Sequence, residues 1–136
     1  MSLLTPAVRA FLTEPHFGVL ATISRDGLPQ QTVVWYELQG DEIMMNTRRG
    51  RAKDSNMVRD PRVSLCVADG YRAVTLVGRV TLDDDQETAH RDITRLAIRY
   101  DGAEDAVRRP DRFAGQTRVT LHLHVQRVVP YGVGER

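Results

Sequence analysis

Hydrophobic residues recur along most of the chain at the spacing of β-strands. The β-rich runs, which are short and separated by turn residues, cover residues 18–23, 30–38, 42–46, 63–68, 73–82 and 118–129. Asp26-Gly27 and Asp69-Gly70 each join two runs, and glycine at this position accepts the positive φ of a tight hairpin turn. Because hairpins join the runs and the spacing of βαβ units is missing, we predict a mainly β domain with α insertions. In it, six antiparallel strands close into a small barrel.

A short helix precedes the strands. Thr5 is suited to cap it, and Pro6 fits the first helical position, where its missing N–H would have no partner. Its apolar face consists of Val8, Phe11 and Leu12. A second short helix is predicted over residues 51–59. It ends before Pro61, because proline disfavours helical backbone in the residue that precedes it.

A longer helix interrupts the strands after residue 82. Its predicted start lies in the acidic triplet Asp83–Asp85, where Asp84 and Glu87 have the spacing of a capping box. Gly102 is suited to end this helix, and its apolar face consists of Ala89, Ile93, Leu96, Ala97 and Tyr100. Capping explains the triplet better than calcium does, because the spaced ligands of a calcium loop are missing. We expect the polar residues 108–115 to form a loop with room for one helical turn.

Size and composition fit one domain over residues 1–136. With 136 residues, 15.4 kDa and 41% hydrophobic residues, the chain can build a single core. A net charge of +1 and 6% aromatic residues argue against a nucleic-acid binder, which usually has a basic surface or stacking aromatics. No apolar run is long enough to span a membrane, no secretory signal is visible, and Cys66 has no second cysteine to pair with. We therefore expect a cytoplasmic protein.

The segment 46–56 holds the most informative residues. It leaves a strand, turns at a glycine and enters the second helix, whose free N–H groups and dipole attract an anion. Arg51 and Lys53, the single lysine among 19 basic residues, lie at this end of the helix, where cations oppose the dipole. A bound phosphate would remove this conflict, with arginine gripping two oxygens and lysine acting as a point charge. The alternative is a solvated, arginine-rich loop that Asp54 and Asp60 neutralise.

The order of these features resembles the pyridoxamine 5′-phosphate oxidase-like split-barrel family. The resemblance is carried by a short N-terminal helix followed by Gly18-Val19-Leu20-Ala21-Thr22, Asp26-Gly27-Leu28-Pro29-Gln30, a strand ending in Asn46-Thr47, the step Arg51-Ala52-Lys53, and Asn56 before Arg59-Asp60-Pro61-Arg62-Val63. It is strongest over residues 17–68, and it is closer to the actinobacterial branch that binds the deazaflavin coenzyme F420 than to the true pyridoxamine phosphate oxidases. The resemblance implies an FMN-binding type of split β-barrel, and a homodimer with the cofactor at the subunit interface.

The resemblance also implies roles for individual residues at the cofactor. Arg51 and Lys53 would hold its phosphate, with Ala52 between them. The strand that contains residues 30–34 would lie along the flavin-like ring. Because side chains alternate between the two faces of a strand, three candidate contacts to the cofactor share one face: Gln30, Thr32 and Val34. Polar family positions near the phosphate match Asn46, Thr47 and Asn56. We further infer that Arg48 and Arg49 attract the acidic oligoglutamate tail of F420, the alternative being that both are simply solvated.

The expected function is that of an F420-dependent oxidoreductase, which transfers a hydride from the reduced coenzyme to a small conjugated molecule. The chemistry then belongs to the cofactor, and no catalytic residue is predicted. Two alternatives stay open: an FMN-dependent oxidoreductase on the same fold, and a non-catalytic protein that binds a flavin or F420. Oxidation of pyridoxamine phosphate is not expected, because the sequence ends at Val133-Gly134-Glu135-Arg136 without a counterpart of the family's substrate-binding Arg and His segment.

Three further positions have simpler interpretations. His122 and His124 share one face of the last strand, but no third ligand lies nearby in sequence, so we expect an interface or surface pair and no metal site. Trp35 and Tyr36 lie on opposite faces of their predicted strand, which places one in the core and the other at a dimer face. Cys66 has no neighbouring His or Lys to form a thiolate, so it is not a predicted nucleophile.

Overall fold

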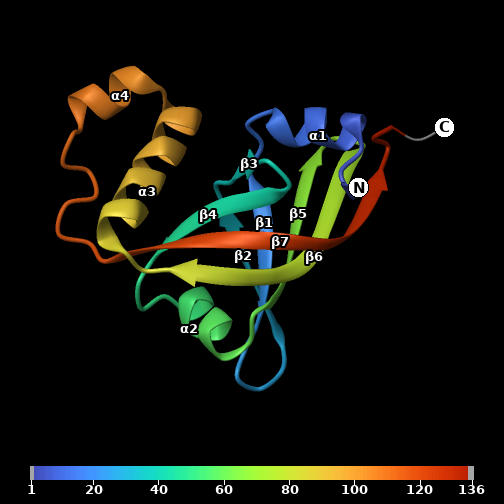
Figure 1. The fold of residues 1–136 in the computed structure, drawn as a ribbon, viewed down its shortest axis with the longest axis horizontal. Coiled ribbons are helices and arrows are strands. Elements are labelled where there is room, and N and C mark those ends of the chain that lie inside the picture. Colours follow the sequence, from blue (N-terminus) through green and yellow to red (C-terminus); the bar gives the residue numbers. More distant parts are fainter. Residues whose placement is uncertain (1, 135–136) are drawn as a thin grey trace.

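The computed structural model describes residues 2–134. Met1 lies outside the described residues, and so do Glu135 and Arg136, the second half of the C-terminal segment Val133-Gly134-Glu135-Arg136. Seven strands of the described chain form one antiparallel sheet in the order β2-β1-β5-β6-β7-β4-β3 (Figure 1). The strands are β1 (Gly18–Ile23), β2 (Pro29–Val34), β3 (Glu37–Gln39), β4 (Glu42–Arg48), β5 (Arg62–Asp69), β6 (Arg72–Asp83) and β7 (Arg118–Tyr131).

The prediction of a mainly β antiparallel domain is confirmed. The described residues form seven strands instead of the predicted six, and their sheet curls without closing completely. The run 30–38 is divided into β2 and β3, which become the two edges of an open, curled sheet. The break falls at Trp35 and Tyr36, because the backbone of Tyr36 bonds to side chains instead of to a strand. The Tyr36 N–H donates to the Tyr100 hydroxyl at 3.2 Å, and the Tyr36 carbonyl accepts from Arg99 Nε at 3.0 Å.

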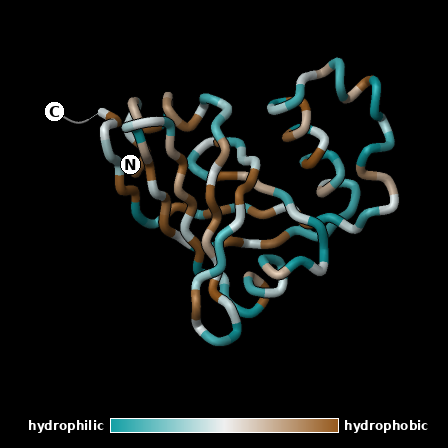
Figure 2. The backbone as a smooth tube through the Cα atoms, turned by 180° about the vertical axis from the view of Figure 1, so that it is seen from behind, coloured by the Kyte–Doolittle hydropathy of each residue, from teal (hydrophilic) through white to brown (hydrophobic). Residues whose placement is uncertain are grey.

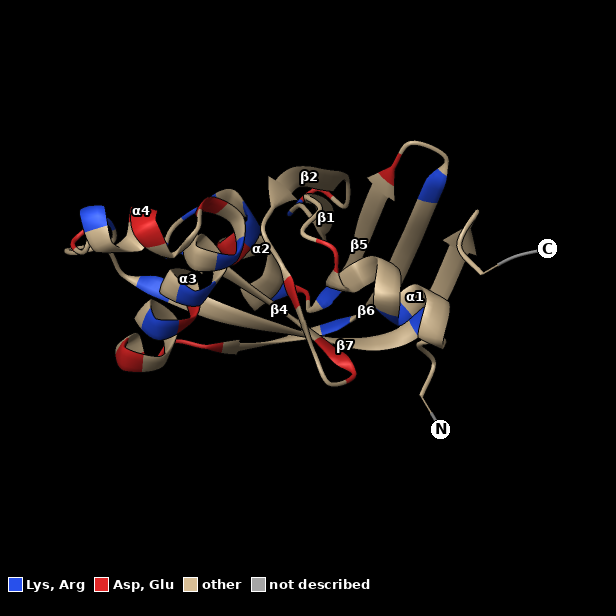
Figure 3. Ribbon diagram, turned by 90° about the horizontal axis from the view of Figure 1, so that it is seen from above, with Lys and Arg blue, Asp and Glu red and all other residues tan. Residues whose placement is uncertain are grey.

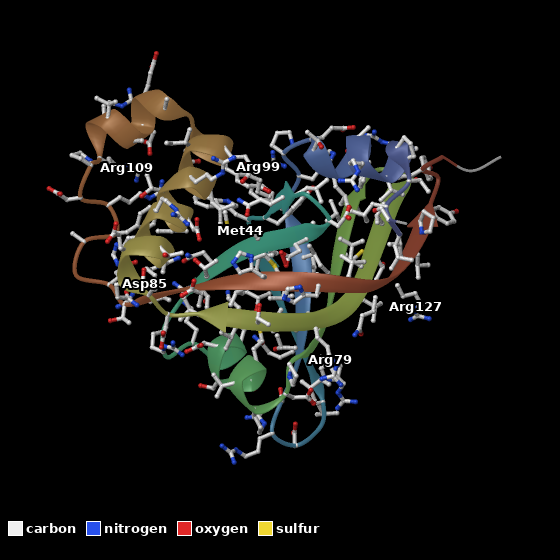
Figure 4. The ribbon with its side chains drawn as sticks, in the orientation of Figure 1. Met44, Arg79, Asp85, Arg99, Arg109 and Arg127 are labelled. Carbon is white, nitrogen blue, oxygen red and sulfur yellow. The ribbon has the colours of Figure 1, made fainter. Side chains whose placement is uncertain are left out.

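The helices are α1 (Pro6–Thr13), α2 (Ala52–Arg59), α3 (Gln86–Asp101) and α4 (Ala103–Arg108). The Thr5 side chain caps α1 as predicted, accepting from the Val8 N–H. The predicted Asp84 cap of α3 is wrong: Asp85 accepts from the backbone N–H of Thr88 at 3.0 Å (Figure 4), whereas Asp84 lies 3.4 Å from Arg49. No helix within residues 2–134 combines the length and apolar character needed to cross a membrane.

Helix α4 was not predicted. It is polar and buries no residue, so it lacks the apolar periodicity by which a helix is recognised in sequence. Its position is held by ion pairs: Arg112 lies 2.7 Å from Asp101, and Arg109 lies 2.7 Å from Asp105. The polar stretch that follows forms turns over residues 110–115, in agreement with the predicted loop.

The core has two parts, one on each side of β4. The larger lies inside the curl of the sheet, where the strands show hydrophobic segments in Figure 2, and α1 adds Val8, Phe11 and Leu12 to it. The smaller lies between β4 and α3, where Met44 contacts the helix (Figure 4); its buried members are Met44, Ile93 and Leu96. Helix α3 therefore covers the outer face of β4 and leaves room for a cleft beside it.

The pairing of β6 with β7 contains a bulge. The register shifts between Val77, which is opposite Arg127, and Gly78, which is opposite Val125. Gly78 is buried, and a Cβ atom built on it would lie 2.0 Å from the carbonyl oxygen of His124. Glycine therefore allows the two longest strands to approach closely where the sheet bends.

Arg99 ties the end of α3 to the end of α1. In Figure 4 its side chain reaches from α3 toward α1, and its Nε donates to the Tyr36 carbonyl. Its two terminal nitrogens donate to the carbonyl oxygens of Leu12, Thr13 and Glu14, at 3.1–3.3 Å. These carbonyls close a helix C-terminus, where a cation is favourable.

Replacing Arg99 by methionine is expected to lower the free energy of unfolding by about 1–2 kcal/mol, because several carbonyls lose their donor together. Urea denaturation measures the change. Arg95→Met is the matched control: Arg95 lies one turn earlier and makes an exposed ion pair with Glu37, which contributes little. Equal losses in the two variants would contradict the role given to Arg99.

Candidate functional site

A cleft of about 280 Å³ opens between the β2–β3 connection, the start of α2, and α3 with β7. It brings together three of the predicted polar or charged residues, Asn46, Arg51 and Lys53, and the predicted Val34. Figure 3 shows lysine and arginine segments concentrated around α2 and α3. The lining residues are Phe17, Val33, Val34, Trp35, Asn46, Arg51, Lys53, Ile93, Leu96, Phe113 and Arg118.

The start of α2 brings its charges to this cleft. Gly50 turns the chain with φ +94°, Arg51 is extended, and no side chain caps the first N–H groups of the helix. Lys53, in the first turn, is only 6% exposed and makes no hydrogen bond or ion pair within residues 2–134. Burial lowers the pKa of Lys53, and the positive charges of Arg51 and Arg118 lower it further. The folded protein thus buries the Lys53 ammonium group at a helix start and near two other positive charges, where a cation is unfavourable.

Arg118 is the charged residue of the cleft that sequence reasoning missed, and the aromatic residues and, apart from Val34, the aliphatic residues of the lining were also not predicted as site residues. Arg118 begins β7, it is 8% exposed, and its Nε donates to Asn46 Oδ1 at 3.0 Å. Burial, together with the charges of Arg51 and Arg48, lowers the pKa of Arg118 to about 10. Because β4 pairs with β7, Arg118 lies directly opposite Arg48. No local signal connects these two segments, so only the pairing of the strands identifies Arg118.

The carboxylates near this segment do not neutralise the cleft. Asp54 accepts from Arg49 at 3.1 Å and from the Gly50 N–H at 2.9 Å. Asp60 pairs with Arg62 at 2.7 Å. The interpretation of a loop neutralised by Asp54 and Asp60 therefore does not describe Arg51 or Lys53. Buried cations without a carboxylate favour binding of an external anion.

The opposite wall of the cleft is aromatic. The ring of Trp35 stacks on Tyr100 with 5.3 Å between centroids, and Phe17 stacks on the same ring at 5.6 Å. Phe113 lies against Arg118 at 5.4 Å. Tyr36 is fully buried in the core, which confirms half of the prediction for the Trp35-Tyr36 pair. The cleft thus combines a cationic end with flat apolar surfaces, which suits a planar ring that carries an anionic group.

The other predicted site residues do not line the cleft. Gln30, Thr32 and Asn56 belong to one hydrogen-bond chain through Thr22: Asn56 donates to Thr22 at 3.1 Å, Thr22 to Gln30 at 3.2 Å, and Gln30 to Thr32 at 3.1 Å. The chain fixes α2 against β1 and β2. Thr47 is buried and its hydroxyl has no partner among the described residues, and Ala52 is exposed at the first position of α2.

The two arginines before the glycine differ. Arg49 is paired with Asp54 and with Asp84, at 3.1 and 3.4 Å. Arg48 is exposed and makes no ion pair within residues 2–134. Of the two, only Arg48 is therefore free to meet an acidic ligand.

Groups with metal-ligating atoms are satisfied by other partners. Within residues 2–134, Glu14, His16 and Asp69 are near enough to share an ion, but the Arg72 guanidinium contacts both carboxylates, at 3.0 and 2.6 Å. His124 contacts Glu42 at 2.8 Å through Nδ1, and its Nε2 contacts Thr81. These contacts account for the residues without a metal ion.

The lowered pKa of Lys53 predicts a pH dependence of stability. Between this lowered pKa and the ordinary value of 10.5, the unfolded chain holds a proton that the folded chain has lost. Because the unfolded state binds more protons there, the free energy of unfolding rises with pH. We expect the wild type to gain stability relative to Lys53→Met as the pH rises toward 10.5. Thermal unfolding without ligand measures the difference, and parallel curves would exclude Lys53 as its source.

Comparison with known proteins places the chain in a family. A model of the pyridoxamine 5′-phosphate oxidase family matches residues 4–130. A conserved hypothetical protein of Mycobacterium tuberculosis is 28% identical, with TM-score 0.80 over 96% of this chain and 86% of its own. A structure described as an F420 reductase is 26% identical, with TM-score 0.72 over 89% and 94%. A heme-binding protein of Mycobacterium smegmatis, at 23% identity and TM-score 0.69, shares the fold over 97% of this chain and 56% of its own. The split-barrel sheet and the match over almost its whole length show that this chain belongs to the pyridoxamine 5′-phosphate oxidase family.

Proposed function

We propose that this protein is an F420-dependent oxidoreductase that passes a hydride from the reduced deazaflavin coenzyme to a small conjugated molecule. The observation that carries the proposal is the cleft in which Arg51, Lys53 and Arg118 converge beside aromatic side chains, with no carboxylate in its lining as far as residues 2–134 form it. The likeness to a structure described as an F420 reductase supports the choice of cofactor. The coenzyme, when bound, supplies the hydride chemistry.

The chain's own residues bind and orient the coenzyme. Lys53 and Arg51 hold the phosphate together with the uncapped N–H groups of α2, which favours an anion through both charge and hydrogen bonds. Arg118 adds a third cation at the same end. Trp35 and Val34 offer apolar surface to the ring, while Gln30, Thr32, Asn46, Thr47, Ala52 and Asn56 remain proposed contacts around the ring and the phosphate.

The cations continue beyond the phosphate end. Arg118 lies opposite Arg48 in the β4–β7 pairing, so positive charge extends from the buried cleft to the exposed surface. FMN ends at its phosphate, whereas F420 continues into an acidic oligoglutamate tail. The extended charge therefore favours F420 over FMN, which remains the alternative cofactor.

Arg48→Ala is expected to weaken binding of F420 with a long tail by roughly threefold and to leave FMN binding unchanged, since an exposed ion pair contributes about 0.2–1 kcal/mol. Arg49→Ala is the matched control, because Arg49 is already paired with Asp54 and Asp84. Fluorescence titration at low salt measures both. If Arg49→Ala has the larger effect, the tail does not follow Arg48.

A second copy of the chain is proposed to complete the cleft. Phe17 and Val33 line it and are 60% and 65% exposed. The outward face of β1, β5 and β6 carries several apolar side chains, with Ser64 and Thr75 among them, so it is less polar than the outer face of a solvated sheet usually is. Its half-buried side chains include Val19, Ala21, Cys66, Ala73 and Val77. Covering this face with the same face of a second copy gives a homodimer with the cofactor at the subunit interface.

Titration of the purified protein with F420, FMN and heme side by side tests the proposal. We expect F420 to bind most tightly; heme should bind weakly, because the lining within residues 2–134 contains no His or Cys to ligate iron. Steady turnover with reduced F420 and a panel of conjugated acceptors then separates an enzyme from a binding protein. If FMN binds more tightly than F420, the FMN-dependent alternative is supported. If F420 binds without turnover, the protein is a non-catalytic F420-binding protein. If neither cofactor binds, the proposal is overturned.

A further inference from the structure

Arg118 is a buried cation whose partners within residues 2–134 are all neutral. Its Nε donates to Asn46 Oδ1 at 3.0 Å and its Nη1 to Gln116 Oε1 at 2.9 Å, and the centre of the Phe113 ring lies 5.4 Å from the guanidinium carbon. The side-chain amide of Gln86 holds the backbone of Arg118: its Oε1 accepts from the N–H at 3.0 Å, and its Nε2 donates to the carbonyl at 2.9 Å. Asn46, Gln86 and Gln116 thus form an amide cradle around Arg118.

Several other arginines of the described chain are paired with a carboxylate instead. These carboxylates raise the pKa of their arginines, which are Arg62, Arg72, Arg95 and Arg109. The pKa of Arg118 is lowered, by burial and by the charges of Arg51 and Arg48. An amide oxygen accepts a hydrogen bond from a guanidinium as a carboxylate does, but it adds no negative charge. The amide cradle therefore holds Arg118 in place and leaves its positive charge uncompensated.

The amide cradle also leaves most of the Arg118 donors free. Of the five guanidinium hydrogens, the one on Nε is used by Asn46 and one on Nη1 by Gln116. The other three, one on Nη1 and two on Nη2, make no hydrogen bond within residues 2–134. Because these two nitrogens are adjacent, they form a fork that can bind two oxygens of one phosphate or carboxylate group. Arg118 lines the cleft, so this fork is available to an acid group that binds there.

We propose that Gln116 is a positioning residue for anion binding: its neutral oxygen orients the Arg118 guanidinium without compensating its charge, which is left for the acid group of a ligand. The backbone of Gln116 is fixed independently of its side chain. Its carbonyl accepts from His90 Nε2 at 2.7 Å, and its N–H donates to the Phe113 carbonyl at 3.2 Å. This inference rests on the proposed function in taking the acid group to be the phosphate of the cofactor.

A merely structural link between Gln116 and Arg118 makes a different prediction. For such a link only the strength of the hydrogen bond matters, so a glutamate at position 116 serves at least as well as the glutamine. If the neutrality of the acceptor matters, the glutamate pairs with Arg118, stabilises the protein without ligand and takes the place of the ligand's acid group. Affinity and stability then change in opposite directions.

The experiment compares Gln116→Glu and Gln116→Met with the wild type. Gln126→Glu is the matched control and is expected to retain wild-type affinity, because Gln126 is an exposed glutamine of β7 outside the cleft lining. Titrations with inorganic phosphate, FMN and F420 measure affinity, and urea denaturation without ligand measures stability. We expect Gln116→Glu to weaken binding by about tenfold or more and to raise stability. Gln116→Met changes no charge; it is expected to lower stability and to weaken binding roughly threefold, the value of one neutral hydrogen bond.

Gln116→Met decides whether the neutral acceptor positions Arg118, because an added negative charge near the cleft repels an anion by itself. Wild-type affinity in Gln116→Met overturns the inference, and so does a ligand-free Gln116→Glu protein that is less stable than the wild type. If Gln116→Met does not fold, Gln116→Ala makes the same comparison. A wild type that binds phosphate but neither cofactor overturns the proposed function alone, since the phosphate titrations still decide the role of Gln116. A wild type that binds none of the three overturns both.

Discussion

Replacing Lys53 by alanine or methionine is expected to weaken binding of F420 or FMN by about 1.5–3 kcal/mol, because a charge-assisted contact to the phosphate is lost. Lys53→Met is also expected to stabilise the protein without ligand, since Lys53 is buried, has no acidic partner in the described part of the chain and has a lowered pKa. Lys53→Met keeps most of the apolar stem, so the opposite signs of the two effects separate charge from packing. Calorimetric titration measures the first effect and thermal unfolding the second.

Arg25→Ala serves as the control for this prediction, because Arg25 is an exposed cation away from the cleft lining. Its removal changes the net charge by the same amount and is expected to change neither affinity nor stability appreciably. Unchanged cofactor affinity in both Lys53 variants would remove Lys53 from the site, and a lower stability of the ligand-free Lys53→Met protein would contradict the account of its burial.

Gly78→Ala is expected to lower the free energy of unfolding by about 3 kcal/mol. The added Cβ would lie 2.0 Å from the His124 carbonyl oxygen, and this oxygen belongs to the backbone of β7, so it cannot move aside without disturbing the β6–β7 pairing. Urea denaturation, followed by circular dichroism, measures the loss.

Gly18→Ala provides the comparison for Gly78→Ala. A Cβ on Gly18 would meet Leu65 Cδ1 at 2.7 Å, which is the end of a side chain that can change its rotamer. The loss for Gly18→Ala is therefore expected to be smaller. Equal losses at the two positions would show that the backbone contact at the bulge is not what makes Gly78 necessary.

Local patterns in the sequence predicted most of the elements. Thr5 and Pro6 mark the start of α1, and β1 has the predicted bounds Gly18–Ile23. The errors occur where side chains from distant segments replace local bonds. Tyr36 leaves the strand because Arg99 and Tyr100 bond its backbone, and neither residue is near it in sequence. Helix α4 depends on ion pairs to Asp101 and Asp105 instead of on a buried apolar face.

The candidate site was predictable to the extent that it is local. Arg51 and Lys53 were identified because two cations at a helix start oppose the helix dipole, and both line the cleft. Arg118 was not identified, because its place beside them depends on the β4–β7 register. Arg48 and Arg49 are neighbours with the same chemistry, and only their partners in the folded chain distinguish them. The sequence pattern thus predicts two of the cations of the cleft, while the fold adds the third, Arg118.

The place of β7 in the sheet determines when the cleft is completed during synthesis. β7 is the last strand of the described chain, yet it lies between β6 and β4, and it carries Arg118. During synthesis, β4 therefore keeps one unpaired edge while β5, β6 and helices α2–α4 are made. Pairing β4 with β7, which lies far from it in sequence, slows folding. A nascent chain that lacks β7 has neither the complete sheet nor the full charge of the cleft. The cleft proposed to bind the cofactor is consequently completed only after β7 has joined the sheet.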